Sequence, residues 1–271
     1  MDKATKQKIV NHYDKVSPYY QKHWGDHIHH GYYITNKESN KQATENLMTL
    51  LIDKCNLKKH SKILDIGCGV GGTSIYLANN YNCDVTGITI SPVQVAMAES
   101  SSKGMKKKPK FQVVDANKLA MAGKYDYLFA IEMISHLDKR SNFFRNCSRL
   151  LRKKGRMSIA AWLKESDITA AQEDKFIKPI EKGMLVELPT KKEYFKHFDN
   201  NGLRLFYFED ISSKVKKTWD ISLEIIEDRS LWKLALEHGD EFVDFLKAFH
   251  AMKKGFSSGA FRYVVMVIEK I

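Results

Sequence analysis

The stretch "ILDIGCGVGGTSIYLA", Ile63 to Ala78, decides the fold of this chain. A short apolar run is followed by an aspartate, a turn with four glycines and a helix-like segment. Glycine lets a turn bring its backbone close to a ligand that a side chain would exclude. In an open α/β sheet, the turn after the first strand lies at the ligand crevice. The stretch therefore predicts a strand, a ligand-binding turn and a helix.

The same kind of pattern continues on the C-terminal side of this stretch. Short runs rich in β-branched and aromatic residues alternate with helix-like segments: "KILDI", "DVTGITI", "FQVVD", "YDYLFAIEM" and "GRMSIAAW". This alternation is typical of parallel strands joined by crossover helices, and it predicts a doubly wound α/β core from Lys62 to Leu163. Two later runs, "LRLFYFED" (Leu203 to Asp210) and "FRYVVMVIEK" (Phe261 to Lys270), predict two more strands.

Length and composition predict a single domain. With 271 residues, 43% of them hydrophobic, the chain can build one sizeable core that carries insertions. Ser39 is a plausible N-cap for a helix that ends near Cys55. We expect four parts: a helical cap at 1–58, a cofactor-binding core at 59–163, the remaining strands at 164–271, and helical lid insertions within these at 164–201 and 211–258.

Charge and composition also limit the compartment and the partners. The net charge is +12, but the lysines are spread along the chain, and we interpret the densest cluster, Lys103 to Lys110, as solvated surface rather than a nucleic-acid site. The four cysteines form no CxxC pair, no stretch approaches 18 uncharged apolar residues, and the first ten residues are too polar for a signal peptide. We therefore expect a cytoplasmic protein, as a monomer or homodimer.

Three cofactors could occupy the glycine turn. A phosphate-binding Walker loop needs a lysine after the glycines, but Gly72 is followed by Thr73. The spacing of Gly67, Gly69 and Gly72 satisfies the dinucleotide pattern GxGxxG, which also requires an acid at the end of the second strand. That end reads "GITISP" and has none. The sulfonium and amino group of S-adenosylmethionine explain an acid just before the glycines, here Asp65.

The motifs as a group resemble a known family. "ILDIGCGVGG" followed by "GITISPVQVAMA" resembles class I methyltransferases, and "WGDHIHHGYY" resembles the tocopherol methyltransferase group. This group is similar to sarcosine/dimethylglycine methyltransferases and, more distantly, to cyclopropane fatty acid synthases. The resemblance covers most of the chain, from about Tyr13 to the last strand, and implies a Rossmann-like sheet and S-adenosylmethionine as the cofactor.

The resemblance also implies positions for the cofactor. Asp65 and Gly67 correspond to the amino acid end, Thr89 and Gln94 to the ribose, and Asp115 to the adenine amine. The family commonly has a proline-containing loop after the adenine position, and "NKLAMAGKYDY" lacks it. The full set of expected cofactor-binding residues is Tyr33, Asp65, Gly67, Cys68, Gly69, Gly71, Thr89, Ile90, Gln94, Asp115, Ala116 and Glu132.

Candidate catalytic residues follow the fourth strand. Glu132 and His136 in "AIEMISHLD" stand one helical turn apart, at the edge where the methyl group is expected. A histidine can accept a proton near neutral pH, so either side chain could serve as a base. The alternative is structural: Glu132 caps a turn and His136 packs against the cofactor. Their presence does not identify the atom that is methylated.

The histidine-rich segment before the core allows several interpretations. Asp26, His27, His29 and His30 are all potential metal ligands, but the resemblance places this segment over the cofactor, and we expect no metal. His30 is a further catalytic candidate, with simple packing as the alternative. Aromatic and Met side chains of the second insertion suit an apolar acceptor or form core: Trp219, Phe242, Phe245, Phe249 and Met252.

The sequence thus predicts methyl transfer from S-adenosylmethionine to a small-molecule acceptor, either hydrophobic, phenolic or amine-bearing. The net charge leaves RNA or protein methylation as one alternative, against which stand the diffuse lysines and the absence of an "NPPY" or "DPPY" tetrapeptide. A non-catalytic S-adenosylmethionine-binding protein is another. An amphipathic lid that touches a membrane surface is an additional expectation.

Overall fold

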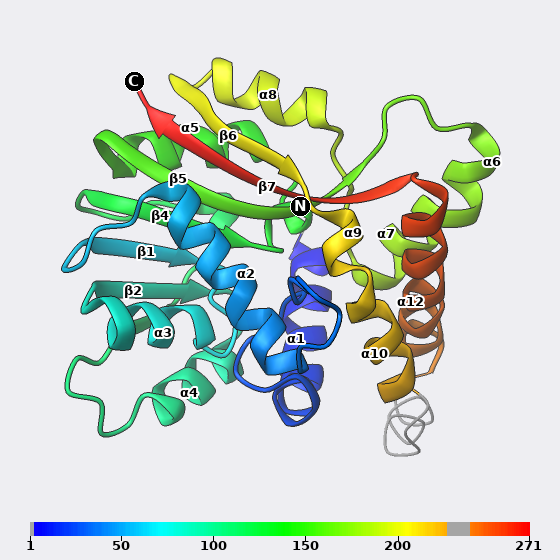
Figure 1. Cartoon of the computed structure of the whole chain (residues 1–271), viewed down its shortest axis with the longest axis horizontal. Helices are drawn as coiled ribbons and strands as arrows, with labels where there is room; N and C mark the ends of the chain where they lie inside the picture. Colours follow the sequence, from blue (N-terminus) through cyan, green and yellow to red (C-terminus); the bar gives the residue numbers. More distant parts are fainter. Residues whose placement is uncertain (1–2, 227–238) are drawn as a thin grey trace.

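A twisted seven-stranded sheet runs through the centre of the computed structural model, which describes residues 3–226 and 239–271 (Figure 1). The strands are β1 (Lys62–Ile66), β2 (Asp84–Thr89), β3 (Lys110–Val113), β4 (Tyr125–Ile131), β5 (Leu151–Lys164), β6 (Leu203–Asp210) and β7 (Phe261–Lys270). Their order is β3-β2-β1-β4-β5-β7-β6. The first five strands are parallel, and β7 runs antiparallel to both β5 and β6. The predicted doubly wound α/β fold is confirmed, with a strand in each of the seven predicted runs.

Helices cover both faces of this sheet and one of its ends. The longer helices are α1 (Lys3–Trp24), α2 (Asn40–Cys55), α3 (Gly72–Tyr81), α4 (Pro92–Ser101), α5 (Arg140–Leu150), α7 (Lys178–Met184), α8 (Lys191–Asp199), α10 (Lys217–Ile226) and α12 (Asp240–Ser258). Shorter turns are η1 (Ala116–Lys118), η2 (Ile134–His136), α6 (Ala170–Gln172), the π-helical η3 (Glu173–Ile177) and α9 (Ser212–Val215). None of the described helices combines the length and apolarity needed to cross a membrane.

The core has two layers because strand side chains alternate between the two faces of the sheet. In β7, Tyr263 and Val265 belong to the layer that includes α2, α10 and α12, whereas Val264 and Met266 belong to the layer with α5 and α8. All four side chains are buried. Both faces of the sheet are therefore covered by protein, which leaves the ends of the strands as the place for a ligand.

The predicted helix after Ser39 is confirmed. Ser39 accepts a hydrogen bond from the backbone N–H of Gln42, and the Gln42 side chain accepts one from the backbone N–H of Ser39. This capping box fixes the first turn of α2. The helix ends at Cys55, after which Asn56 takes a left-handed conformation that few residues other than glycine and asparagine adopt easily.

The insertions after β5 and β6 differ in what they cover. The helices α7, α10 and α12 pack together beyond the strand ends (Figure 1). At Gly183 a Cβ atom would lie 2.2 Å from the Asp244 carbonyl oxygen, so α7 and α12 approach closely. By contrast, α8 lies in the first predicted lid insertion but packs against the sheet, with Tyr194 and Phe198 fully or almost fully buried in the core. Residues 227–238, part of the second predicted insertion, and the side chain of Phe242 lie outside the described part of the chain.

Candidate active site

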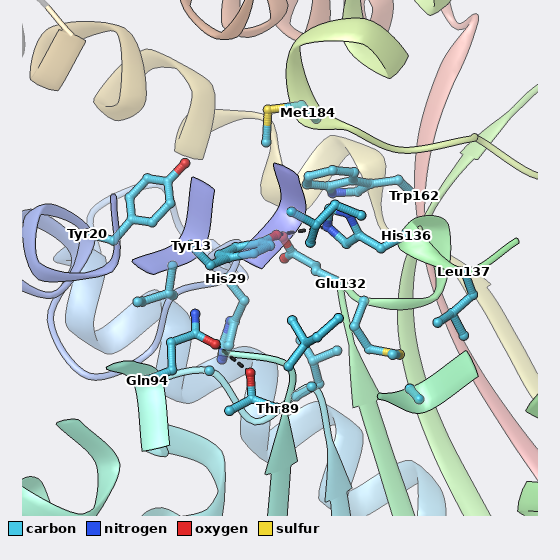
Figure 2. Close-up of a pocket in the computed structure, with 18 of the residues that line it drawn as sticks. Tyr13, Tyr20, His29, Thr89, Gln94, Glu132, His136, Leu137, Trp162 and Met184 are labelled. Carbon is cyan, nitrogen blue, oxygen red and sulfur yellow. Dashed lines mark hydrogen bonds between the residues drawn. The ribbon is translucent and has the colours of Figure 1, made fainter. Parts of the chain in front are cut away.

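A pocket opens at the carboxyl edge of the sheet, beneath α1, α7, α10 and α12 (Figure 2). Its floor includes Gly67 and Gly69 after β1, Thr89 at the end of β2, and Glu132 after β4. The empty space is about 1230 Å³, including the part open to solvent. Glycines of the turn line one part of this space, and aromatic side chains such as Trp162 and Trp219 line another.

The glycine turn forms one half of this floor, which we call the cofactor half because the cofactor is expected there. Gly67, Gly69 and Gly71 all have positive φ angles, which glycine adopts without the strain that a side chain adds. The backbone N–H groups of Gly67 and Cys68 both donate to the Ile88 carbonyl oxygen, at 2.8 and 2.9 Å, and tie the turn to β2. No atom lies within 4 Å of the place where a Cβ of Gly69 would stand, so a ligand can approach the backbone there.

Asp65 lies beneath the turn and does not line the pocket itself. Its carboxylate accepts a 2.7 Å hydrogen bond from the Ser74 hydroxyl in α3 and is almost completely buried. Burial raises the pKa of Asp65 to about 7, and the hydrogen bond from Ser74 only partly opposes this. A positively charged ligand above the turn would favour the ionised carboxylate.

The ribose and adenine positions predicted from the resemblance lie together in the same half. The Thr89 hydroxyl donates to Gln94 Oε1 at 2.6 Å (Figure 2). Asp115 lies next to Ala116 at the rim, and its Oδ2 atom pairs with Lys6 Nζ of α1 at 2.9 Å. All four of these predicted residues, Thr89, Gln94, Asp115 and Ala116, line the pocket, as does Ile90.

Glu132 is held by an unusually dense set of donors. Its Oε1 atom accepts from the backbone N–H of His30 at 2.7 Å, from His30 Nδ1 at 2.9 Å and from the Tyr263 hydroxyl at 2.7 Å. The residue has a φ of +53°, a left-handed conformation that is strained for a side chain of this size. Burial alone would raise the pKa of Glu132, but the charge and hydrogen bonds of His30 outweigh it and hold the pKa below its usual range. Glu132 is therefore a carboxylate at neutral pH, and its Oε2 atom has no hydrogen-bond partner among the described residues.

His136 has a fixed tautomer. Its Nδ1 atom lies 3.1 Å from the Leu185 carbonyl oxygen, which can only accept, so Nδ1 carries the proton. The Nε2 atom then presents a lone pair, which accepts a 2.8 Å hydrogen bond from the Tyr13 hydroxyl (Figure 2). Burial lowers the pKa of His136 to about 4, so the ring is neutral at physiological pH. His136 is consequently a hydrogen-bond acceptor at Nε2, and Tyr13 is its donor.

His29 is a second neutral imidazole in the pocket wall. Its Nδ1 atom lies 2.9 Å from the His30 carbonyl oxygen, which leaves Nε2 with a lone pair. This atom is buried and has no partner among the described residues. Burial lowers the pKa of His29, although the Glu132 carboxylate opposes it. Figure 2 shows the His29 ring pointing to the side of the pocket that holds Thr89 and Gln94.

The second half of the pocket is apolar and aromatic. It is lined by Ile9, Tyr20, Trp24, Trp162, Met184 and Phe249. Trp219 lines it as well, whereas Phe245 and Met252 of the same lid are buried in the core. This part of the pocket is therefore lined largely by rings and apolar side chains, which suits a hydrophobic molecule.

The structure does not bring every expected residue into the pocket. Tyr33 is fully buried behind it, and its hydroxyl donates to Asn40 of α2 at 3.3 Å. Cys68 and Gly71 face α4 and β3 instead: a Cβ on Gly71 would lie 2.8 Å from that of Ala98, and Cys68 packs in the same small cluster. Within the described residues, no group of three or more His, Cys, Asp and Glu side chains is placed to hold a metal ion.

Sequence reasoning missed several lining residues, Tyr13 and Trp162 above all. Tyr13 lies on the same helical face as Ile9, Val16 and Tyr20, at spacings of three and four residues, and this pattern could have identified it. Trp162 lies near the carboxyl end of the strand beside β4, where crevice residues are expected. The hydrogen bond between Tyr13 and His136 spans 123 positions and leaves no local signal.

Fold and site together define a class I S-adenosylmethionine-dependent methyltransferase. The chain belongs to the mycolic acid cyclopropane synthetase family, whose model matches residues 1–263. It is 26% identical to tocopherol O-methyltransferase of Arabidopsis thaliana, over 98% of this chain and 83% of that protein. It is 29% identical to 27-O-demethylrifamycin SV methyltransferase of Amycolatopsis mediterranei, over 100% and 99% of the two chains.

Solved structures show the same fold. The mycolic acid cyclopropane synthase CmaA1, complexed with SAH and CTAB, superposes with a TM-score of 0.88 over 98% of both chains, at 17% identity. The [4+2]-cyclase SpnF superposes with a TM-score of 0.84, over 98% of this chain and 96% of that one, at 22% identity. The fold is therefore shared with proteins of quite different named activities, and the acceptor has to be argued from the site.

Proposed function

We propose that this enzyme transfers the methyl group of S-adenosylmethionine to a hydroxyl oxygen of an apolar small molecule. The observation that carries the proposal is the neutral His136 in an aromatic part of the pocket wall, with Nδ1 protonated and Nε2 accepting a hydrogen bond from the Tyr13 hydroxyl. A hydroxyl must lose its proton when it is methylated, and a site for this reaction needs a proton acceptor next to the reacting oxygen.

The cofactor half of the pocket fits S-adenosylmethionine. Gly67 and Gly69, which line this half, can admit its amino acid end, Thr89 and Gln94 are the expected partners of the ribose hydroxyls, and Asp115 can accept from the adenine amine. The unpartnered Nε2 atom of His29 is a further acceptor for an N–H or O–H of the cofactor. When bound, the cofactor supplies a methyl group on a positively charged sulfur, which leaves as a neutral thioether.

Glu132 and His136 have different roles in this proposal. Three hydrogen bonds fix the Glu132 carboxylate, so it orients His30 and places negative charge near the cationic cofactor. His136 takes the proton. A pKa of about 4 is sufficient because the hydroxyl becomes strongly acidic as its oxygen bonds to the methyl carbon. Burial of both groups keeps water out and fixes their geometry before the acceptor arrives.

The relatives support an oxygen acceptor. Two of the named proteins are a tocopherol O-methyltransferase and a 27-O-demethylrifamycin SV methyltransferase, and a third, (+)-O-methylkolavelool synthase of Herpetosiphon aurantiacus, is 25% identical over 97% of this chain and 93% of that protein. One relative, the norajmaline N-methyltransferase of Rauvolfia serpentina, is named for a nitrogen acceptor, at 30% identity over 67% of this chain. A neutral amine can be methylated before it loses a proton, so it has less need of the base that His136 provides.

The test uses methyl-labelled S-adenosylmethionine and an extract of the cells from which the sequence derives, separated after reaction into apolar small molecules, RNA and protein. We expect label in the apolar fraction, and we expect that blocking free hydroxyls by prior acetylation abolishes it. The matched variant His136→Asn should lower the rate about 100-fold or more while the calorimetric affinity for the cofactor stays within twofold. Label in RNA or protein, or label that survives acetylation, contradicts the proposal.

A further inference from the structure

The hydroxyl of Tyr13 occupies the only lone pair of His136 that can accept a proton. Nδ1 of His136 already carries a hydrogen, directed at the Leu185 carbonyl, and Nε2 accepts from Tyr13 at 2.8 Å. Figure 2 shows the Tyr13 ring lying across the pocket with its oxygen directed at His136 and beside Glu132. A substrate hydroxyl therefore reaches His136 either by displacing Tyr13 or by donating to the Tyr13 oxygen, which still has lone pairs free to accept.

Displacement of Tyr13 is opposed by the way α1 is held. Three residues of this helix make polar contacts with the rim of the pocket: Lys6 pairs with Asp115 at 2.9 Å, Asp14 accepts from the Ser91 hydroxyl, and Ser17 accepts from Gln94 Nε2 at 3.0 Å. These contacts lie on both sides of Tyr13 in the sequence. They fix the helix, and with it the tyrosine, over the site.

The Tyr13 phenol stays protonated. Burial raises its pKa, and the negative charge of Glu132 raises it further. Tyr13 therefore does not act as a base by itself, because its phenolate form is unstable in this site. It can still take one proton and give up another in the same step.

We propose that Tyr13 is a catalytic residue that carries the acceptor's proton to His136. As the hydroxyl oxygen of the acceptor bonds to the methyl carbon, its proton passes to Tyr13 Oη while the Tyr13 proton passes to His136 Nε2. The methyl carbon–sulfur bond breaks, and the sulfur keeps the electron pair. The products are the methyl ether, the neutral thioether and a His136 imidazolium, which returns its proton to solvent by the reverse path after the products leave. This assignment rests on the proposed function, because it needs an acceptor that loses a proton.

The first test needs neither acceptor nor turnover. Nitrogen-15 NMR of the ¹⁵N-histidine-labelled protein reports the tautomer of His136 and the hydrogen bond at Nε2, with the signals assigned through His136→Asn. Tyr13→Phe should move the Nε2 resonance to that of an unbonded lone pair and leave Nδ1 protonated. The matched control is Tyr20→Phe, on the same helix and also in the pocket wall, which should leave the Nε2 resonance in place. An Nε2 resonance unmoved by Tyr13→Phe overturns the proposal.

The second test measures single-turnover methyl transfer with labelled S-adenosylmethionine and the apolar fraction of the extract, in mixtures of H₂O and D₂O. In the wild type a plot of the rate against the deuterium fraction should be curved, because two protons move in the same step. In Tyr13→Phe we expect a rate about 100-fold lower and a straight line, because one proton moves, while cofactor affinity measured by calorimetry stays within twofold.

The outcomes separate the two proposals. A straight line in the wild type, or a rate within threefold of wild type in Tyr13→Phe, overturns the relay and leaves O-methylation intact. Wild-type transfer that survives blocking of hydroxyl groups contradicts the proposed function and with it the relay. If the wild type labels nothing in the apolar fraction, the proposed function fails and the relay fails with it, because the relay needs an acceptor that loses a proton; the NMR result then tests only the hydrogen bond between Tyr13 and His136.

Discussion

His30 donates to the same oxygen of Glu132 twice, once from its backbone N–H at 2.7 Å and once from its imidazole Nδ1 at 2.9 Å. The two residues lie 102 positions apart, on the segment before α2 and at the end of β4. The His30 ring itself packs against Trp219 and Tyr263, with ring centroids 4.6 and 4.7 Å away. The pair thus joins the N-terminal segment, the sheet and the lid at one carboxylate.

The loss of stability on removing this carboxylate should depend on the residue that replaces Glu132. Glu132→Ala leaves two donors of His30 and the hydroxyl of Tyr263 without an acceptor and should lower the free energy of unfolding by about 3 kcal/mol or more. Glu132→Gln retains an accepting oxygen and should cost about 1 kcal/mol. Urea denaturation of both variants measures the difference, and equal losses would show that the hydrogen bonds do not stabilise the fold.

The strained backbone at Glu132 gives an independent prediction. Because its φ is +53°, glycine should be tolerated there better than alanine, although both remove the side chain. Glu132→Gly is expected to be about 1 kcal/mol more stable than Glu132→Ala in the same urea measurement. At an ordinary helical or extended position the order would be reversed, and that order would exclude a left-handed conformation at this residue.

Asp65 should make the stability depend on pH. Its pKa rises from 3.8 in the unfolded chain to about 7 in the fold, so the folded state binds more protons between these values. The contribution to stability is complete below pH 4 and is lost as the pH rises to 7, at most on the order of 4 kcal/mol. Buried histidines with lowered pKa values have the opposite effect on stability over part of this range. They bind protons more readily in the unfolded chain, so they make the stability rise with pH.

The contribution of Asp65 can be isolated with Asp65→Asn, which keeps the shape and does not titrate. Subtracting the unfolding free energy of this variant from that of the wild type at each pH removes the histidines, which both proteins share. The difference should fall from pH 4 to pH 7 in the absence of cofactor. A difference that stays constant, or that rises with pH, would mean that Asp65 is ionised in the ligand-free fold.

The rate should be insensitive to mild acid. With a pKa of about 4, roughly nine tenths of His136 remains neutral at pH 5, against about 3% for an imidazole with an ordinary pKa of 6.5. Single-turnover rates at saturating cofactor should therefore change less than twofold between pH 7 and pH 5. A tenfold loss over this interval, with the protein still folded by circular dichroism, would place the base at an ordinary histidine or at another residue.

Two glycines of the turn should respond to alanine for different reasons. At Gly72 a Cβ would lie 2.0 Å from the Asp26 carbonyl oxygen, which belongs to the segment that carries His29 and His30. Gly72→Ala should displace this segment, lower the unfolding free energy by several kcal/mol and weaken cofactor binding more than tenfold. Gly69→Ala meets no atom, so its cost should be about 1 kcal/mol from the backbone conformation. Calorimetry and urea titration compare the two; equal stabilities would show that the Asp26 segment is not packed on the turn.

The sheet was predictable from the sequence because its signal is local. Each strand contains a compact apolar run, and β1, β6 and β7 have the predicted limits, whereas β5 begins at Leu151, before the predicted run that starts at Gly155. The glycine turn was also predictable from a local pattern, because its backbone conformation restricts which residues can occupy it. The side-chain pairs of the site come from segments far apart in the chain, and nothing in a linear pattern records that Tyr13 meets His136 or that Tyr33 turns to Asn40.

The two predicted lid insertions show that composition alone does not distinguish helices that fill the core from helices that line the pocket. Tyr194 and Phe198 lie four residues apart, a spacing shared by helices that cover a sheet and helices that cover a ligand. Only the fold shows that these two fill the core beside α5 while Trp219 and Phe249 line the pocket. The roles expected for individual residues in cofactor binding, those of Asp65 beneath the turn and Asp115 in the pocket among them, stay predictions until binding is measured.

The contacts that fix α1 use groups that are also expected to bind the cofactor. Asp115 and Gln94, two groups expected to hold the cofactor, are already engaged by Lys6 and Ser17 of this helix. A cofactor that uses these groups competes with the protein's own N-terminus, so its affinity is the difference between two sets of interactions. The contacts that hold Tyr13 over the site therefore lower the affinity of any cofactor that uses Asp115 and Gln94.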